Sequence, residues 1–214
     1  MRILELFAGT ASFSNVAKER GHWTYTTDID PQFNCDWTGD IMEFDPAWLM
    51  LPVDAIWASP PCETFSVASI GHHWQGGSKA YEPKTVAAKE GIARVKRTLE
   101  IITELRPRVW IIENPRGVLR KMPFMEALPY RHTVSYCQYG DTRMKPTDLW
   151  SNFALDVRPM CKNGDPCHEA APRGARTGTQ GVKGYRDRSR VPHDLCLSII
   201  EQLEDDVFSP KDGD

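Results

Sequence analysis

The chain alternates short apolar runs with amphipathic stretches, a pattern that predicts alternating strands and helices. Apolar residues dominate 2–7 and 53–58, and 23–27 consists of aromatic and β-branched residues; short runs of these kinds are typical of strands. Residues 12–20, between 2–7 and 23–27, have a helical pattern that stops at Gly21. Units of this kind, repeated along a chain, indicate an α/β fold.

A longer amphipathic helix is predicted in the middle of the chain. Its apolar positions are spaced four, three, four and three residues apart, at Ala88, Ile92, Val95, Leu99 and Ile102. Pro107 ends it, and a further buried run occupies 109–112. We predict a hairpin from 131–137 and 149–153, followed by a final helix over 191–203. This order favours a doubly wound, Rossmann-like, mainly parallel sheet.

Small and acidic residues follow the first three predicted strands. A small-residue turn spans 8–11, Asp28 and Asp30 follow the second strand, and Asp40 follows the third. Ligands bind at this edge of open α/β sheets. The small turn would admit a ligand, Asp28 or Asp30 could accept hydrogen bonds from a ribose, and Asp40 could accept one from an adenine amino group. The pattern predicts a nucleoside pocket; an ordinary tight turn with surface acids is the alternative.

A thiol and a carboxylate follow the next two buried runs. Cys62 comes directly after Ser59-Pro60-Pro61, and Glu113 comes directly after 109–112. We expect both side chains at the ligand-binding edge of the sheet. A thiolate there could act as a nucleophile, and the neighbouring acid could hold a heterocycle in its protonated form. The alternatives are an inert buried cysteine and a solvated strand-terminal acid.

Two segments lack hydrophobic periodicity. Residues 63–83 are rich in Gly, Ser, His and Trp, and loops of this length are usually functional or mobile. Between 158 and 190, eight Lys and Arg residues stand against three acids. Such a segment can bind phosphates and become ordered on a nucleic acid, and a flexible linker with solvated charges is the alternative.

The basic segment also contains three residues of the types that bind zinc. Cys161, Cys167 and His168 form a C-x5-C-H arrangement, which is not a standard zinc spacing and has no clear fourth ligand. Cys137 could be brought near them by the fold. We interpret these cysteines as structural thiols and assign no metal.

Composition limits the class of protein. The 214 residues are 41% hydrophobic with a net charge of −3, which fits one domain and gives no overall positive field for nucleic acid. No run approaches the ~20 apolar residues of a membrane span, and no signal peptide is recognisable. Six cysteines without a tight framework indicate reduced thiols. We therefore expect a cytoplasmic protein.

The motifs, taken in order, resemble those of the DNA cytosine-5 methyltransferase family. They are the F-A-G turn, D-I-D-P, G-D-I, S-P-P-C, E-N-P, Q-Y-G and a final V-P-x-x-L helix, and they span essentially the whole chain. The pair P-C and E-N is a specific signal, whereas the glycine turn alone is not. The resemblance implies a fold of the S-adenosylmethionine-dependent methyltransferase type and methyl transfer to carbon 5 of cytosine in DNA. The target base would be flipped out of the duplex.

The resemblance also implies roles for individual residues. Cys62 would add to carbon 6 of cytosine and Glu113 would bind its N3 and amino group, while Arg143 or Lys145 would supply a cation. Loop 63–83 would close over the extruded base. The residues implied to bind S-adenosylmethionine are Phe7, Ala8, Gly9, Thr10, Ala11, Asp28, Ile29, Asp40, Ile41, Pro60 and Ser189. The residues implied to contact the substrate are Pro61, Ser66, Asn114, Arg173, Arg176, Lys183 and Arg186.

Four features of the motifs depart from the family pattern. Ala11 stands where the family has its second turn glycine, Glu63 replaces the usual glutamine, and Pro115 replaces the usual valine. The family's arginine-rich motif becomes Arg143-Met144-Lys145-Pro146-Thr147. These changes leave open transfer of a modified group from an altered sulfonium donor, or methylation of RNA. A non-catalytic DNA-binding module that needs a partner subunit is a further alternative.

The expected organisation has three parts. Residues 1–153 form the catalytic and cofactor-binding domain, 154–190 a reduced basic target-recognition segment, and 191–205 a helix that returns to the catalytic domain. The small recognition segment predicts short or relaxed sequence specificity. The compact size suits a phage or mobile-element enzyme. We expect a monomer in a bacterial or phage-infected host cytoplasm.

Overall fold

The computed structural model describes residues 1–77, 81–169 and 184–208, and a mainly parallel sheet forms its centre. The strands of this sheet are β1 (Arg2–Leu6), β2 (Trp23–Asp28), β3 (Trp37–Thr38), β4 (Ala55–Ala58), β7 (Val109–Pro115), β8 (Tyr130–Ser135) and β9 (Pro146–Ser151). The seven strands lie in the order β3-β2-β1-β4-β7-β9-β8. Only β9 is reversed, since it pairs antiparallel with both β7 and β8. The predicted doubly wound, mainly parallel sheet is confirmed.

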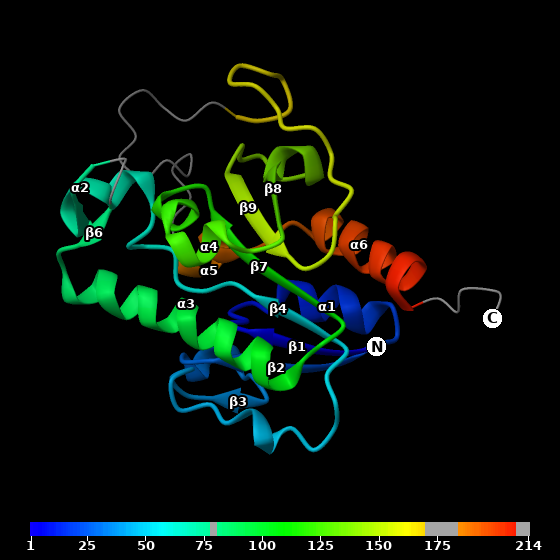
Figure 1. Cartoon of the computed structure of the whole chain (residues 1–214). Coiled ribbons are helices and arrows are strands. Elements are labelled where there is room, and N and C mark those ends of the chain that lie inside the picture. The colour runs from blue at the N-terminus through cyan, green and yellow to red at the C-terminus, as the bar shows by residue number, and fades with distance from the viewer. Residues whose placement is uncertain (78–80, 170–183, 209–214) are drawn as a thin grey trace.

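Helices cover both faces of the sheet (Figure 1). The described α-helices are α1 (Ser12–Glu19), α2 (Ile70–His73), α3 (Val86–Leu105), α4 (Pro123–Glu126), α5 (Tyr185–Ser189) and α6 (His193–Gln202). One core cluster joins the sheet to α3 through Ala88, Val95 and Ile102, three positions of the predicted apolar stripe. The other core cluster joins the sheet to α1 and α6. Within the described ranges, no helix has the length and apolar character of a membrane span.

The strand order reverses between β1 and β4. From β1 the chain continues outward through β2 to β3, and it then returns to form β4 on the other side of β1. In open α/β sheets a reversal of this kind creates a crevice at the carboxyl ends of the strands, where ligands bind. The crevice edge carries the turn after β1, the acids after β2 and β3, and the S-P-P-C segment after β4.

The segment 63–83 contains more structure than its composition predicts. It includes α2 and a two-stranded antiparallel pair, β5 (Trp74–Gln75) and β6 (Glu82–Pro83). The side chains of Phe65 and Trp74 are buried, with ring centroids 5.7 Å apart. Because these aromatic rings belong to the core, the expectation of a structureless loop is wrong for the described part of this segment.

The strand that carries Glu113 is also longer than predicted. β7 extends to Pro115, and Glu113 pairs with Leu149 of β9 instead of ending the strand.

Candidate active site

A pocket lies at the carboxyl ends of the first three strands. Its lining comprises Phe7, Thr27, Asp28, Ile29, Gly39, Asp40, Ile41, Pro61 and Arg94. Five of these residues were predicted to bind the cofactor, and Pro61 was predicted to contact the substrate. Arg94, Thr27 and Gly39 were not predicted as site residues. Apolar walls with two carboxylates suit a nucleoside, which presents a flat ring and hydroxyl donors.

The turn after β1 has an unusual backbone. Phe7, Gly9 and Ala11 all have positive φ, at 57°, 50° and 52°. The Gly9 amide donates to Asp28 Oδ2 at 2.8 Å, so Asp28, the last residue of β2, holds the turn after β1 in place. Each carboxylate oxygen can accept a further hydrogen bond. Asp28 can therefore position the turn and still accept from a ligand hydroxyl.

Asp40 forms an ion pair with a residue of α3. Arg94 Nη2 lies 3.1 Å from Asp40 Oδ2, and the Met42 amide donates to Asp40 Oδ1 at 3.1 Å. Burial opposes ionisation of Asp40, but the Met42 amide and the Arg94 guanidinium outweigh it and lower the pKa of Asp40. Asp40 is therefore a carboxylate acceptor at neutral pH, fixed beside the pocket.

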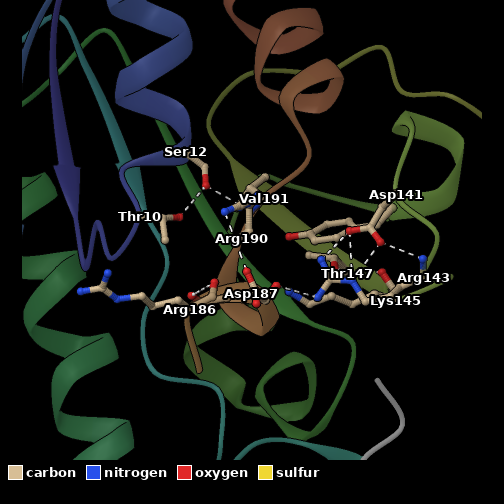
Figure 2. Close-up of polar contacts among 12 residues, drawn as sticks. Thr10, Ser12, Asp141, Arg143, Lys145, Thr147, Arg186, Asp187, Arg190 and Val191 are labelled. Atoms are coloured by element: carbon tan, nitrogen blue, oxygen red, sulfur yellow. Dashed lines mark hydrogen bonds and ion pairs between the residues drawn. The ribbon is translucent and has the colours of Figure 1, made fainter. Parts of the chain in front are cut away.

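The segment around α5 lies against the turn after β1 (Figure 2). The Val191 amide donates to Ser12 Oγ at 3.2 Å, and a Cβ atom built on Gly9 would lie 3.9 Å from Ser189 Oγ. Ser189, a predicted cofactor residue, is thus next to the turn despite its distance in sequence. Arg186 was predicted to contact the substrate; here its guanidinium lies 5.1 Å from the Phe33 ring centroid.

Cys62 follows β4 at the same edge of the sheet. Ala58 pairs with Ile112, so the residues after β4 and the end of β7 lie side by side. Burial raises the pKa of the Cys62 thiol to about 11, although the positive charge of Lys145 opposes this rise. The charges of Glu63 and Glu113 raise the pKa further. The thiol is therefore protonated at neutral pH in this state.

Glu113 and Lys145 are linked through Tyr136. The Tyr136 hydroxyl donates to Glu113 Oε1 at 2.8 Å, and Lys145 Nζ lies 4.5 Å from the centroid of the Tyr136 ring. Glu113 is buried, as is Tyr136. The arrangement fixes one oxygen of Glu113 and places a cation near the thiol. Tyr136 was not predicted as a site residue.

Arg143 and Lys145 contact different groups. Arg143 Nε lies 2.9 Å from Asp141 Oδ1, and Arg143 Nη1 donates to the Asp187 carbonyl at 3.1 Å (Figure 2). These contacts attach the 141–143 loop to α5. Of the two predicted cations, Lys145 is the one whose charge acts on Cys62.

Asn114 connects the Glu113 strand to the segment that carries Cys62. Its side chain is fully buried, and its Nδ2 donates to the Pro60 carbonyl at 2.8 Å. Asn114, which was predicted to contact the substrate, therefore supports the segment that carries the thiol. Its Oδ1 is buried without a hydrogen-bond partner among the described residues.

A glycine permits close packing between the Cys62 segment and the chain after β7. The Val118 amide donates to the Phe65 carbonyl at 2.8 Å, and a Cβ built on Gly117 would lie 2.1 Å from that carbonyl oxygen. Trp74 Nε1 also donates to the Thr64 carbonyl at 2.6 Å. Ser66, a predicted substrate residue, caps the next helical turn by accepting from the Ala68 amide at 3.3 Å.

Several predicted residues remain to be placed. Ala8 is buried and its amide donates to the Thr27 carbonyl at 2.8 Å, while Thr10 Oγ1 lies 3.1 Å from Ser12 Oγ. Pro60 is buried. Arg173, Arg176 and Lys183 lie outside the described residues.

The structure brings Cys137 to the thiols and histidine of the basic segment. The sulfur atoms of Cys137, Cys161 and Cys167 and a ring nitrogen of His168 all lie within 4.8 Å of one another. Cys137 is thus the fourth member of this group, and sequence spacing alone did not identify it.

A viral protein is similar to this chain over almost its whole length. A Frog virus 3 (isolate Goorha) protein described as a "Probable DNA (cytosine-5)-methyltransferase" is 31% identical over 216 residues, covering 94% of this chain and 99% of the viral protein. The chain belongs to the DNA cytosine-5 methyltransferase family. Its motif order and the placement of P-C and E-N at one sheet edge agree with this assignment. No protein-family model matches the chain.

Solved methyltransferases share the fold. The Entamoeba histolytica methyltransferase EhMeth has a TM-score of 0.51 and 13% identity, over 76% of this chain and 57% of that one. The S. pombe Dnmt2 methyltransferase has a TM-score of 0.48 and 14% identity, over 73% of this chain and 51% of that one. The chain spans about half the length of the solved structures it matches. As a member of the DNA cytosine-5 methyltransferase family, it carries the shared fold in a shorter chain.

Proposed function

We propose that this protein methylates carbon 5 of cytosine in DNA, with S-adenosylmethionine as the methyl donor and Cys62 as the covalent nucleophile. The observation that carries the proposal is the shared position of Cys62 and Glu113. Cys62 follows β4, Glu113 lies near the end of the adjacent parallel strand β7, and Pro61 beside the thiol lines the pocket that contains Asp28 and Asp40. One edge of the sheet thus has a nucleophile, a carboxylate for the base and a pocket whose residue types suit a nucleoside.

The residues of the pocket fit S-adenosylmethionine. Asp28 and Asp40 offer carboxylate oxygens to hydroxyl and amino donors, Phe7, Ile29 and Ile41 offer apolar surface, and the turn after β1 offers close backbone approach. When bound, this cofactor supplies an electrophilic methyl group on a sulfonium.

Each reacting residue has a distinct task. Addition of the Cys62 thiolate to carbon 6 of cytosine turns carbon 5 into an enamine-type nucleophile. Glu113 holds N3 and the exocyclic amino group, favouring protonation of the ring as the adduct forms. Lys145 stabilises the thiolate, and elimination of Cys62 after loss of the carbon 5 proton restores the aromatic ring.

The high pKa of Cys62 has a consequence for the order of events. A thiol with a pKa of about 11 is protonated at pH 7, so few molecules carry the thiolate before substrate binds. A basic group that comes near the thiol in the complex with DNA must therefore accept its proton. The protonated thiol reacts more slowly than a thiolate with alkylating agents and oxidants.

We further propose that target specificity is short or relaxed. The region between Phe153 and α5 is brief, and its described part has Arg158 and Lys162 but little buried surface. Lys and Arg contacts to phosphates position a protein on DNA without reading its sequence.

Covalent trapping on DNA that contains 5-fluorocytosine tests the chemistry. With S-adenosylmethionine present, methyl transfer to a carbon 5 that bears fluorine leaves no proton to remove, so Cys62 cannot be eliminated. The wild type and a Cys35→Ala control should then form a complex that survives denaturation, whereas Cys62→Ala should not. No complex with the wild type would refute the mechanism. The same oligonucleotide as RNA is the comparison substrate, and preferential trapping on RNA would refute the DNA assignment.

Analysis of the modified nucleosides tests the transferred group. DNA incubated with the enzyme and S-adenosylmethionine should yield 5-methylcytosine by mass spectrometry, and any other modified cytosine would reject simple methylation. Sequencing of the modified positions should show a short or degenerate site. A long, strictly required site would contradict relaxed specificity.

A further inference from the structure

Three thiols and one imidazole form a cluster that the proposed reaction does not use. Cys137 Sγ lies 3.2 Å from Cys161 Sγ and 3.5 Å from Cys167 Sγ. His168 Nδ1 lies 3.8 Å from Cys161 Sγ and 3.6 Å from Cys167 Sγ. We propose that these four residues bind a structural zinc ion.

The spacing of the four atoms suits tetrahedral coordination. With Zn–S near 2.3 Å and Zn–N near 2.0 Å, ligand atoms at tetrahedral angles are separated by about 3.5 to 3.8 Å. The Cys137–Cys167 and Cys167–His168 separations fall within this range, and the Cys161–His168 separation lies at its upper edge. Cys137 and Cys161 are closer together, and zinc would move these sulfurs apart by roughly half an ångström. Their separation of 3.2 Å is far longer than a disulfide bond, and all six cysteines are free.

The surrounding chain is folded so that the four ligands face one another. Cys137 lies in the helical turn after β8. A tight turn, in which the Lys162 amide donates to Asp165 Oδ2 at 2.6 Å, brings the two ends of the segment 161–168 together. Gln138 Nε2 donates to Cys167 Sγ at 3.3 Å, a hydrogen bond of the kind that orients metal ligands and offsets thiolate charge.

The segment needs such a cross-link because it buries little else. Among residues 154–169, only Leu155 and Cys161 are buried. Arg158 donates from Nη1 to the Gln138 carbonyl at 2.6 Å, and the Glu169 amide donates to the Thr142 carbonyl at 2.9 Å. Both contacts are made with the hairpin turn that also carries Cys137. A structural metal commonly replaces a hydrophobic core in segments this short.

A closed set of four protein ligands indicates a structural role for the metal. Three cysteines and one histidine leave no open position for water or substrate. On binding, the three thiols release their protons to solvent and the neutral imidazole uses the lone pair of Nδ1. The ion would fasten the start of the basic segment to the 136–145 turn. The chain then continues through Glu169, which contacts the 141–143 loop, and that loop also contacts Asp187 at the far end of the basic segment.

Metal analysis of the tag-free protein tests the proposal directly. Protein expressed with added zinc and passed through gel filtration should contain close to one zinc per chain. Cys167→Ser and His168→Ala should lower the zinc content severalfold, whereas the matched control Cys35→Ser should keep it. His168→Cys, which preserves four ligands, should also retain the metal. Retention of zinc by both Cys167→Ser and His168→Ala would overturn the assignment.

A second measurement on the wild type does not depend on whether the variants fold. Metal-free protein titrated with Co²⁺ under reducing conditions should develop the visible absorption of tetrahedral cobalt thiolate, and Zn²⁺ should bleach it in equimolar amounts. Absence of this absorption, or isolation of the protein with a Cys137–Cys161 disulfide and no metal, would refute the proposal. Neither readout requires methyltransferase activity, so the zinc site and the proposed function can fail independently.

Discussion

The hydroxyl group of Tyr136 donates a hydrogen bond to Glu113 Oε1 at 2.8 Å, and both side chains are buried. Burial, and then the charge of Glu113, raise the pKa of Tyr136 well above its usual value. The hydroxyl therefore stays protonated and remains a hydrogen-bond donor to Glu113. It fixes one carboxylate oxygen, Oε1, and in the proposed reaction the carboxylate binds the base.

Removal of this hydroxyl tests the arrangement. Tyr136→Phe keeps the ring in the core but leaves Glu113 without its donor, so kcat should fall by roughly tenfold to a hundredfold. Steady-state kinetics with DNA and S-adenosylmethionine measure the effect, and thermal unfolding checks that the fold survives. An unchanged kcat in a folded variant would show that Tyr136 does not position Glu113.

The charge of Lys145 should control the reactivity of Cys62. Since Lys145 opposes the rise of the thiol pKa to about 11, Lys145→Met should raise that pKa further and lower the thiolate fraction at every pH below it. Alkylation of Cys62 by iodoacetamide, followed by mass spectrometry, should become severalfold slower between about pH 8 and 9.5. In both proteins the rate should rise about tenfold per pH unit below the pKa.

Lys145→Arg is the matched control, because it keeps the positive charge. Its alkylation rate should stay close to that of the wild type. If Lys145→Met and Lys145→Arg react equally fast, the electrostatic role of Lys145 is wrong.

The sequence predicted most elements of the fold because their physics is local. The α3 stripe at Ala88, Val95 and Ile102 is buried as its spacing required, and the runs predicted as strands became β1, β2, β4 and β7. Cys62 and Glu113 could be placed together because parallel strands end at one edge. These inferences needed only periodicity and a general rule for sheets.

Other features depend on contacts between distant segments. Nothing in the sequence indicates that Arg94 pairs with Asp40 or that Tyr136 reaches Glu113, because a lone Arg or Tyr on an element is usually surface or core. The sequence of 63–83 predicted a loop because short helical turns and a pair of two-residue strands have no detectable hydrophobic period. Cys137 joined Cys161 and Cys167 only through the fold of the hairpin turn.

Close packing at Gly117 should be essential for the Cys62 segment. A Cβ there would lie 2.1 Å from the Phe65 carbonyl oxygen, so Gly117→Ala must displace backbone on one side. We expect a loss of about 1–3 kcal/mol in stability and a larger loss of activity than of cofactor affinity. Denaturant unfolding, kinetics and calorimetric titration with S-adenosylmethionine measure the three quantities.

Gly71 provides the control within the same region. It lies in α2, and a Cβ built on it would have no atom within 4 Å. Gly71→Ala should therefore leave stability and activity nearly unchanged. Equal effects of the two substitutions would argue that the contact with Phe65 is unimportant.

Buried Glu5 should make the stability of the protein depend on pH. Glu5 Oε2 accepts from the Ser14 amide at 2.7 Å at the start of α1, but burial dominates and raises the pKa of Glu5 from 4.5 to about 7. The folded state therefore binds a proton more tightly than the unfolded chain between these pKa values. Stability contributed by protonated Glu5 is complete below pH 4.5 and is lost as the pH rises through about 7.

Glu5→Gln removes this titration and retains an acceptor for the Ser14 amide. Relative to the wild type, the variant should gain roughly 2 kcal/mol in unfolding free energy between pH 5.5 and pH 8. Denaturant unfolding of both proteins at the two pH values gives this double difference, in which the contributions of all other titrating groups cancel. A difference near zero would mean that Glu5 is ionised in the folded state at both pH values, with the amides of α1 compensating for its burial. A negative difference would mean that those amides lower the pKa of Glu5 below its unfolded value.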